Sequence, residues 1–485
     1  MTDPTRTEEN AVAVIPGAEP QTPAGGQAPL DPPKAAKGKH WIEHWEPENE
    51  QFWESTGKKI ARRNLWFSVF AEHIGFSIWT LWSVIVLFMG KDYGFSAADK
   101  FLLVSTPTLI GGLMRLPYTF AVAKFGGRNW TVVSAVLLLI PTTLAAIVLH
   151  PGTSLGTFLL VAALGGVGGG NFASSMTNIN AFYPEKHKGW ALGLNAGGGN
   201  LGVAAIQLVG LLVIGTAGAT VPRLVLFVYL PLIVVASVCA YFFMDNLATM
   251  KGDTKAMREV VRDPHTWVMS FLYVGTFGSF IGYSFAFGLV LQNQFGRTPL
   301  QAAAVTFLGP LLGSFSRPTG GWLADRIGGG KITFFTFIGM AVATVVLILA
   351  STSKSLVLFT VAFVVLFVLT GIGNGSTYKM IPAIFRAKAK VAIANGAEEG
   401  AELLRARRLS GALIGLAGAI GAEGGLFINL AFRQSFADAH SGVPAFVGFL
   451  VFYGLCFAVT WAVYLRKPAE QPTSERGLAL AGAEV

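Results

Sequence analysis

Apolar runs of about twenty residues alternate with shorter polar stretches along most of the chain. A helix of that length crosses the hydrocarbon core of a bilayer, which is about 30 Å thick. The pattern therefore predicts an all-α membrane protein with about twelve transmembrane helices. The predicted spans cover residues 65–89, 101–123, 130–149, 157–183, 190–215, 222–244, 266–292, 301–323, 332–350, 355–385, 409–431 and 444–465.

The polar stretches set the domain organisation. Residues 1–40 are rich in Pro, Gly, Ala and Gln and predict a disordered cytoplasmic tail. Residues 41–64 place aromatic residues near helical spacing and predict an interfacial amphipathic segment, with a plain linker as the alternative. The other predicted parts are an N-terminal six-helix half (65–244), a cytoplasmic linker (245–265), a C-terminal six-helix half (266–466) and a cytoplasmic tail (467–485).

The composition supports a membrane location. Charged residues make up 13% of the chain and hydrophobic residues 52%, whereas soluble domains carry about 25% charged residues. The two cysteines, Cys239 and Cys456, both lie in apolar runs, and the histidines are scattered. This pattern predicts no disulfide framework, metal site, cofactor or catalytic residue.

The basic residues sort by loop, which predicts the orientation. With the N-terminus inside the cell, 27 Lys and Arg residues lie on the cytoplasmic side and six on the opposite side. The positive-inside rule then places both termini in the cytoplasm of a multi-pass cell (inner) membrane protein. This sorting also explains the net charge of +9, so we expect no nucleic-acid partner.

The two six-helix halves repeat one another. Arg115 and the following Lys124-Phe-Gly126 recur as Arg317 and Arg326-Ile-Gly328, at an offset of 202. Gly168-x-Gly170-Asn171 recurs as Gly371-Ile-Gly373-Asn374, at an offset of 203. Pseudo-symmetric halves with a site between them near the bilayer midplane are typical of transporters.

Arg115 and Arg317 lie within predicted spans, where a charged side chain costs at least about 2.5–3.5 kcal/mol. Two arginines from symmetry-related helices are expected to converge on one central site. A small anion between them would relieve their repulsion, and the planar guanidinium fits planar oxyanions in a bidentate manner. The alternative is a structural arginine that is paired with carbonyl groups or a carboxylate.

Other predicted spans contribute candidate ligands. In the span 266–292, Tyr273, Phe277, Phe280 and Ser284 form one helical stripe, so an aromatic ring can cover a flat anion while Tyr273 donates its hydroxyl. Such a stripe is also common in ordinary packing. Polar donors that suit a weakly hydrated oxyanion come from two further spans, and they are Asn171, Ser175, Asn178 and Asn195.

These motifs resemble the nitrate/nitrite porter family (NarK-like) of the major facilitator superfamily. The resemblance extends from about Trp45 to Arg466. The strings that carry it are Gly170-Asn171-Phe-Ala-Ser-Ser-Met176, Ala191-Leu-Gly-Leu-Asn195, Arg115-x-Pro117-Tyr118 and Leu272-Tyr273-x-x-Thr276-Phe277-Gly-Ser-Phe280.

The resemblance implies the major facilitator superfamily fold and transport of nitrate and nitrite. It implies that Arg115 and Arg317 hold the anion and that Phe277 stacks on it. Tyr273 and Asn178 would form hydrogen bonds to the anion. The family works by rocker-switch exchange or by proton symport, and we expect this chain to function as a monomer.

Ionisable residues within the spans bear on the coupling mode. Glu72, His73 and Lys379 depart from the pattern of exchanger-type members, and Glu423 is a further buried acid. All four are candidate proton-coupling residues. One alternative is that Glu72 and His73 lie near the cytoplasmic headgroups. Another is that Lys379 and Glu423 form a static ion pair. The sequence slightly favours proton-coupled nitrate import, with nitrate/nitrite antiport as the alternative.

Two further functions stay open on the sequence alone. The first is transport of another cargo, such as a different anion or a sugar. The second is the function of a membrane redox subunit, although the sequence offers no pattern of cofactor ligands.

Overall fold

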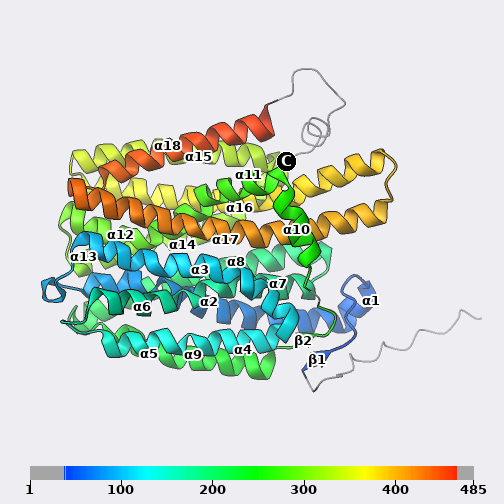
Figure 1. Cartoon of the computed structure of the whole chain (residues 1–485), viewed down its shortest axis with the longest axis horizontal. Coiled ribbons are helices and arrows are strands. Elements are labelled where there is room, and N and C mark those ends of the chain that lie inside the picture. Colours follow the sequence, from blue (N-terminus) through cyan, green and yellow to red (C-terminus); the bar gives the residue numbers. More distant parts are fainter. Residues whose placement is uncertain (1–37, 39, 251, 467–485) are drawn as a thin grey trace, which may run out of the picture. The chain divides into compact units, whose positions relative to one another are not determined.

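The computed structural model describes residues 38, 40–250 and 252–466. The predicted tails, 1–40 and 467–485, therefore lie outside the described residues, except for Gly38 and His40. Nearly all of the described chain is helical, as the apolar pattern predicts (Figure 1).

The N-terminal half contains six helical segments, some of which are broken into two helices. Segments one and two are α2 (Lys58–Phe88) and α3 (Ala97–Phe125), and the third and fourth are the pairs α4–α5 and α6–α7. Their bounds are α4 Gly127–Leu137, α5 Leu139–Val148, α6 Leu155–Gly165, α7 Val167–Phe182, α8 Glu185–Ala217 and α9 Arg223–Phe243. A two-residue strand, β2 (Asn246–Leu247), and a short helix, α10 (Thr254–Arg262), follow.

The C-terminal half repeats this arrangement. Its first segment consists of α11, a π-helical turn η3, and α12, and its second is the pair α13–α14. The bounds are α11 Pro264–Tyr273, η3 Val274–Gly278, α12 Ser279–Phe295, α13 Pro299–Thr306, α14 Leu308–Ile327, α15 Gly329–Thr352, α16 Leu356–Ala394, α17 Glu399–Ala439, α18 Val443–Thr460 and η4 Trp461–Leu465. A 3₁₀ turn, η2 (Lys91–Tyr93), joins α2 to α3.

Ten helices of the described chain are long and apolar enough to cross a membrane. The two predicted spans outside this set are α3 and α13–α14, which carry Arg115 and Arg317. The arginines, together with nearby glycines and prolines, lower the hydropathy of these helices. Both are packed by other helices, since α3 contacts α7 and α17, and α14 contacts α16 and α8.

Packing and backbone geometry confirm the repeat of two six-helix halves. The pairs α2–α8 and α3–α7 in the first half correspond to α12–α17 and α14–α16 in the second. Gly126 and Gly328, which are 202 residues apart, both turn the chain with positive φ, 89° and 94°. Residues other than glycine rarely adopt this backbone conformation. The same turn therefore occurs at the same position in both halves.

Several helices extend beyond the predicted spans. The apolar run of residues 355–385 lies in α16, which continues to Ala394, and α17 begins at Glu399, ten residues before the predicted span 409–431. The extra residues are mainly Ala, Lys, Glu and Arg, which are good helix formers. Hydropathy detects only the membrane-embedded part of a helix, so it misses these extensions (Figure 1).

The predicted interfacial segment, 41–64, has a different environment from the expected one. Strand β1 (Trp41–Ile42) pairs in parallel with β2, and α1 (Glu50–Phe52) and a π-helical turn η1 (Trp53–Gly57) lead into α2. Trp45, Phe52 and Trp53 are buried against Phe182 and Tyr183, at the end of α7. These rings therefore contact protein, and a direct role of the segment in lipid binding stays a prediction.

Candidate anion-binding site

Arg115 is completely buried on α3. Its Nε donates a hydrogen bond to the Gly169 carbonyl oxygen at 3.2 Å, and its Nη1 donates to the Gly418 carbonyl oxygen at 2.8 Å. Its Nη2 is buried and has no hydrogen-bond partner among the described residues. The backbones of α7 and α17 thus orient the guanidinium without neutralising its charge, and one nitrogen is left to bind a ligand.

Arg317 occupies the equivalent position on α14 and is also buried. Its Nη2 donates a long hydrogen bond to the Tyr273 hydroxyl oxygen, at 3.4 Å. Its Nη1 is buried without a partner in the described part of the chain. Because Tyr273 accepts from Arg317, its own hydroxyl proton is available to an anion. Each half of the protein therefore supplies a buried cation with a free donor.

Aromatic rings lie between and beside the two guanidinium groups. The Cζ atoms of Arg115 and Arg317 lie 4.6 and 6.0 Å from the centre of the Phe172 ring. The Phe277 ring centre is 4.8 Å from the Arg115 Cζ, and its plane is stacked on those of Phe172 and Tyr273. Cation–π attraction offsets part of the cost of burying these charges. The rings also form flat walls around the free nitrogens.

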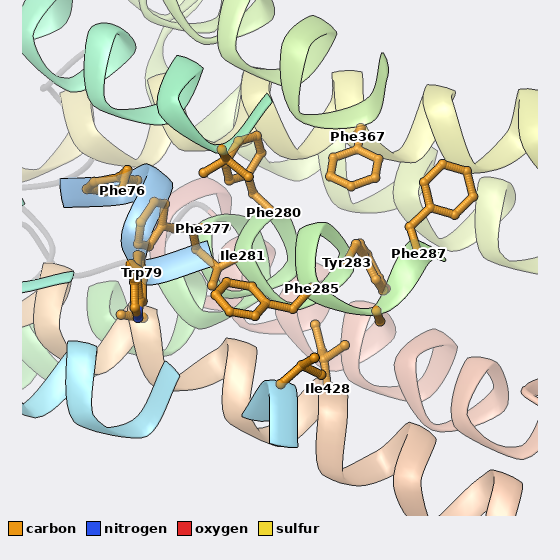
Figure 2. Close-up of a cluster of buried hydrophobic side chains, with 14 of the residues drawn as sticks. Phe76, Trp79, Phe277, Phe280, Ile281, Tyr283, Phe285, Phe287, Phe367 and Ile428 are labelled. Atoms are coloured by element: carbon orange, nitrogen blue, oxygen red, sulfur yellow. The ribbon is translucent and has the colours of Figure 1, made fainter. Parts of the chain in front are cut away.

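Residues of α2 complete the wall. The centres of the Trp79 and Phe76 rings lie 5.4 and 6.0 Å from the Arg115 Cζ. Figure 2 shows both rings beside Phe277, at one end of a buried apolar cluster that continues along α12. Water is thereby excluded from one side of the guanidinium, which strengthens its attraction for an anion.

A π-helical turn positions Tyr273 and Phe277. The turn runs from Val274 to Gly278, between α11 and α12. Such turns are rare and occur frequently at functional sites. A Cβ atom at Gly278 would lie only 2.7 Å from the Gly424 Cα, so the turn packs directly on α17. The predicted stripe assumed a regular α-helix, yet Tyr273, Phe277, Phe280 and Ser284 are all buried.

The predicted polar ligands separate into two groups. Asn171 is buried next to Phe172, and both of its amide atoms lack partners within the described chain. The Asn195 amide nitrogen donates to Ser175 Oγ and to Glu72 Oε2, the latter at 2.7 Å. Ser175 Oγ also lies 2.9 Å from Ser68 Oγ. These residues form a buried polar network between α2, α7 and α8.

Asn178 does not join this grouping. It lies two helical turns beyond Asn171, which is about 10 Å along α7. A Cβ atom at Gly127 would fall within 1.8 Å of its Oδ1, so Asn178 packs against the start of α4, beyond the end of α3. Both amide atoms of Asn178 are buried without a hydrogen-bond partner among the described residues. Its direct contact with the anion stays a prediction. Helical periodicity placed Asn178 on the correct face of α7 but could not give its depth.

The candidate proton-coupling residues also differ in position. Glu72 is buried, and it lies within electrostatic range of both Arg115 and Arg317. This burial contradicts the alternative in which Glu72 sits at the headgroups. His73 points elsewhere, since its Nδ1 lies 3.1 Å from the Gly198 carbonyl oxygen. Glu423 is half-buried beside Gly112 of α3, and its carboxylate has no hydrogen-bond partner among the described residues.

Lys379 lies outside the central site. Its Nζ donates to both carboxylate oxygens of Asp325, at 2.9 and 2.7 Å, and both side chains are exposed. The alternative in which Lys379 and Glu423 form a static ion pair is therefore wrong. The reason is that Lys379 directly follows Tyr378 on α16, so its side chain points about 100° away from it. Tyr378 reaches the Arg317 guanidinium, whereas Lys379 points to the end of α14.

We expect Lys379→Gln to leave nitrate affinity and the pH dependence of transport unchanged. An exposed ion pair contributes about 0.2–1 kcal/mol, and Lys379 is not part of the wall around the arginines. Binding assays and uptake at two external pH values would check this. A large loss of nitrate affinity in Lys379→Gln, with normal thermal stability, would show that Lys379 contributes to the anion site.

The sequence reasoning missed Phe172, Trp79 and Tyr378. Tyr378 lies with its ring centre 5.4 Å from the Arg317 Cζ. Phe172 directly follows Asn171 within a glycine-rich string, so its position in that string was the available signal. For Trp79 no signal separates it from the other aromatic residues of α2.

Known proteins share this architecture. Residues 65–397 match the family model described as Major Facilitator Superfamily. Among solved structures, a bacterial homologue of the human lysosomal transporter Spinster matches with a TM-score of 0.62 and 16% identity, over 84% of this chain and 97% of its own. A D-xylose–proton symporter matches with a TM-score of 0.62 and 14% identity, over 82% of this chain and 96% of its own. At such identities the likeness shows the fold alone.

Closer relatives narrow the family. The nitrate/nitrite transporter NarU of Salmonella typhimurium is 40% identical over 456 residues, which cover 89% of this chain and 98% of the relative. NarU of Escherichia coli is 38% identical, over 89% of this chain and 98% of the relative. A probable nitrate/nitrite antiporter of Thermus thermophilus, NarK2, is 33% identical, over 90% and 99%. The chain therefore belongs to the nitrate/nitrite porter family of the major facilitator superfamily and is a transporter rather than an enzyme.

We expect Phe277→Ala to weaken binding of nitrate by roughly 5- to 30-fold and binding of chloride much less. Loss of a desolvated cation–π contact and of a flat wall costs about 1–2 kcal/mol, and only a planar anion uses the wall. Competition by nitrate and chloride for the same site would measure both affinities.

Phe280→Ala is the matched control for this change. Phe280 lies one turn further along the same cluster, with its ring centre 6.5 Å from that of Phe277. Equal losses for nitrate and chloride in Phe277→Ala, matched by the same losses in Phe280→Ala, would show damage to packing instead.

Proposed function

We propose that this protein transports nitrate, with nitrite as its exchange partner or alternative cargo, by alternating access around a single anion site. Arg115 and Arg317 hold the anion. The observation that carries the proposal is that each guanidinium is buried, faces the Phe172 ring, and keeps one nitrogen without a partner among the described residues. Nitrate is flat, singly charged and weakly hydrated, so it fits between two planar forks and aromatic walls.

The same proposal assigns roles to the other candidate ligands. Phe277 stacks on the anion plane, and Tyr273 donates its hydroxyl proton to one oxygen. Asn171 supplies amide donors from the side of Phe172. Ser175 and Asn195 lie in the polar network of Glu72, and they connect the site to that carboxylate.

The relatives support the choice of cargo. The matched proteins of Salmonella typhimurium, Escherichia coli and Thermus thermophilus bear names that specify nitrate and nitrite, and the alignments cover about nine-tenths of this chain. We place the protein in the cell (inner) membrane with both termini in the cytoplasm, following the positive-inside rule, and we propose that it works as a monomer.

For the coupling mode we favour proton-coupled import. Nitrate stays ionised, and one negative charge entering an inside-negative cell costs about 2.3 kcal/mol per 100 mV. Co-transport of more than one proton reverses this cost and needs a titratable group near the anion. Glu72 is the candidate, since its carboxylate is buried within electrostatic range of both arginines.

Nitrate/nitrite antiport is the second candidate. It is favoured by the relative named as a probable antiporter and by the positions of Lys379 and His73 away from the arginines. Exchange needs only a cationic site that closes when an anion neutralises it.

Uptake into proteoliposomes tests the proposal. Nitrate should enter vesicles that hold the protein, and excess nitrite should compete, whereas glucose or sulfate should not. Vesicles loaded with nitrite, or with buffer under an inward proton gradient, would distinguish exchange from symport. Uptake of nitrate no faster than in protein-free vesicles under both conditions would overturn the proposed function.

A further inference from the structure

Helix α10, in the linker between the halves, has a basic stripe. Lys255, Arg258 and Arg262 follow one another at i, i+3 and i+7 and are exposed. Ala256 and Val260 on the opposite side are buried, and α10 packs on α17 and α11 (Figure 1). The helix is therefore fixed to the C-terminal half and leaves its basic stripe free.

The carboxylates of this region are already engaged elsewhere. Asp253 accepts from Arg408 at 2.9 Å, Glu259 accepts from Arg405 at 2.7 Å, and Asp263 accepts from Lys388 at 2.6 Å. The hydrogen bond from Arg408 lowers the pKa of Asp253, so this carboxylate stays ionised. By contrast, Lys255, Arg258 and Arg262 have no ion-pair partner among residues 40–250 and 252–466.

Tryptophans mark the level of α10 relative to the membrane. Trp267, on the first turns of α11, is 55% exposed, and its Nε1 donates to the Val261 carbonyl oxygen at 3.1 Å. Trp461 is exposed as well, and a contact of 3.3 Å between His265 Nδ1 and the Tyr464 hydroxyl holds η4 beside the start of α11. Exposed tryptophans collect at membrane–water interfaces. α10 thus lies at the level of the lipid headgroups.

A hollow runs along the same face. It measures about 450 Å³ and is lined by Met257, Arg258, Val261 and Arg262. Val261 is 41% exposed, so the hollow combines apolar surface with two guanidinium groups. A phospholipid has the matching parts, because its phosphate is anionic and its acyl chains are apolar.

We propose that α10 binds an anionic phospholipid of the leaflet next to it. The headgroup phosphate accepts hydrogen bonds from Arg258 and Arg262, and Lys255 adds positive charge. The part of the acyl chain next to the headgroup lies along Val261 and Trp267. Because the ion pairs of Asp253 and Glu259 fix α10 to α17, the bound lipid attaches the C-terminal half to that leaflet. The inference is independent of the transported cargo.

Lipid titration of the purified full chain tests this. The delipidated protein in a neutral detergent is titrated with phosphatidylglycerol or phosphatidylcholine, and bound lipids are counted by native mass spectrometry. Phosphatidylglycerol should bind more tightly, and added salt should weaken it. Arg258→Gln with Arg262→Gln should reduce its affinity by roughly tenfold or more, whereas Arg258→Lys with Arg262→Lys should keep most of it, because an ammonium also attracts a phosphate.

The matched control removes one charge from each of two other connections, Lys91→Gln between α2 and α3 with Arg223→Gln at the start of α9, and should leave phosphatidylglycerol binding unchanged. Equal affinity in the control and the Arg258/Arg262 glutamine variant would overturn the proposal. So would full displacement of the lipid by inorganic phosphate, which would indicate a free-anion site. A shift in oligomeric state, without a change in lipid binding, would assign the stripe to a second copy of the chain. If the glutamine variant does not fold, lipid binding that is insensitive to salt in the native protein gives the same negative answer.

Discussion

Nitrate transport should be nearly abolished in both Arg115→Lys and Arg317→Lys. Lysine keeps the positive charge but loses the planar fork. In Arg115 this fork bonds the carbonyl oxygens of Gly169 and Gly418 while a further nitrogen stays free for the anion. An ammonium cannot satisfy all of these groups. Loss of one charge-assisted hydrogen bond costs about 1.5–3 kcal/mol, so nitrate affinity should fall by roughly 10- to 100-fold per variant.

The control for this change is Arg128→Lys. Arg128 also donates through Nε and Nη2 to a carbonyl oxygen, that of Tyr241, but it is only half-buried on α4, and these hydrogen bonds lie at the protein surface. Its substitution should leave nitrate uptake within about twofold of the native rate, since an exposed contact contributes little. Normal uptake by both Arg115→Lys and Arg317→Lys, at normal expression and thermal stability, would remove the arginines from the mechanism.

Acidification outside vesicles should accelerate nitrate entry, and Glu72→Gln should abolish that acceleration. One unit of pH across the membrane supplies about 1.4 kcal/mol per proton. Glutamine has the shape of the carboxylate and can still accept from Asn195, yet it cannot bind and release a proton. Counterflow exchange of nitrate for internal nitrite should survive in the variant, because exchange needs only the arginines.

His73→Gln is the control for Glu72→Gln. His73 is the next residue along α2, but it contacts the Gly198 carbonyl oxygen instead of the arginine site. The His73→Gln variant should keep the acceleration of nitrate entry by external acid. If the native protein requires internal nitrite and ignores the pH gradient, exchange is the surviving mode. An unchanged acid response in Glu72→Gln would exclude Glu72 as the proton carrier.

The fold could be predicted from sequence because the bilayer simplifies the problem. Apolar length alone located the helices, and a fixed offset between Arg115 and Arg317 revealed the repeat that the turns at Gly126 and Gly328 confirm. The helix ends could not be predicted equally well. The polar extension of α17 from Glu399 has no hydropathy signal, and the burial of Trp45 and Trp53 depends on contacts with the distant end of α7.

The candidate site was predictable only in part, for a geometric reason. A buried arginine stands out in an apolar span, so Arg115 and Arg317 could be found without a structure. Aromatic residues such as Phe172 do not stand out, because most of them pack in the core. Position along a helix was the other limit, as Asn178 and Lys379 show. Both lie on helices of the site, but they reach Gly127 and Asp325 instead of the arginines.

Nitrate binding to the purified protein, measured by isothermal titration calorimetry, tests the central claim most directly. The native chain should bind one nitrate. Because both arginines hold the same anion, their effects are coupled. The loss of binding free energy in the double variant Arg115→Lys with Arg317→Lys should therefore not exceed the sum of the losses in the two single variants. Each single variant should lose most of the affinity. Two nitrates per chain, with Arg115→Lys removing one and Arg317→Lys the other, would contradict a shared site.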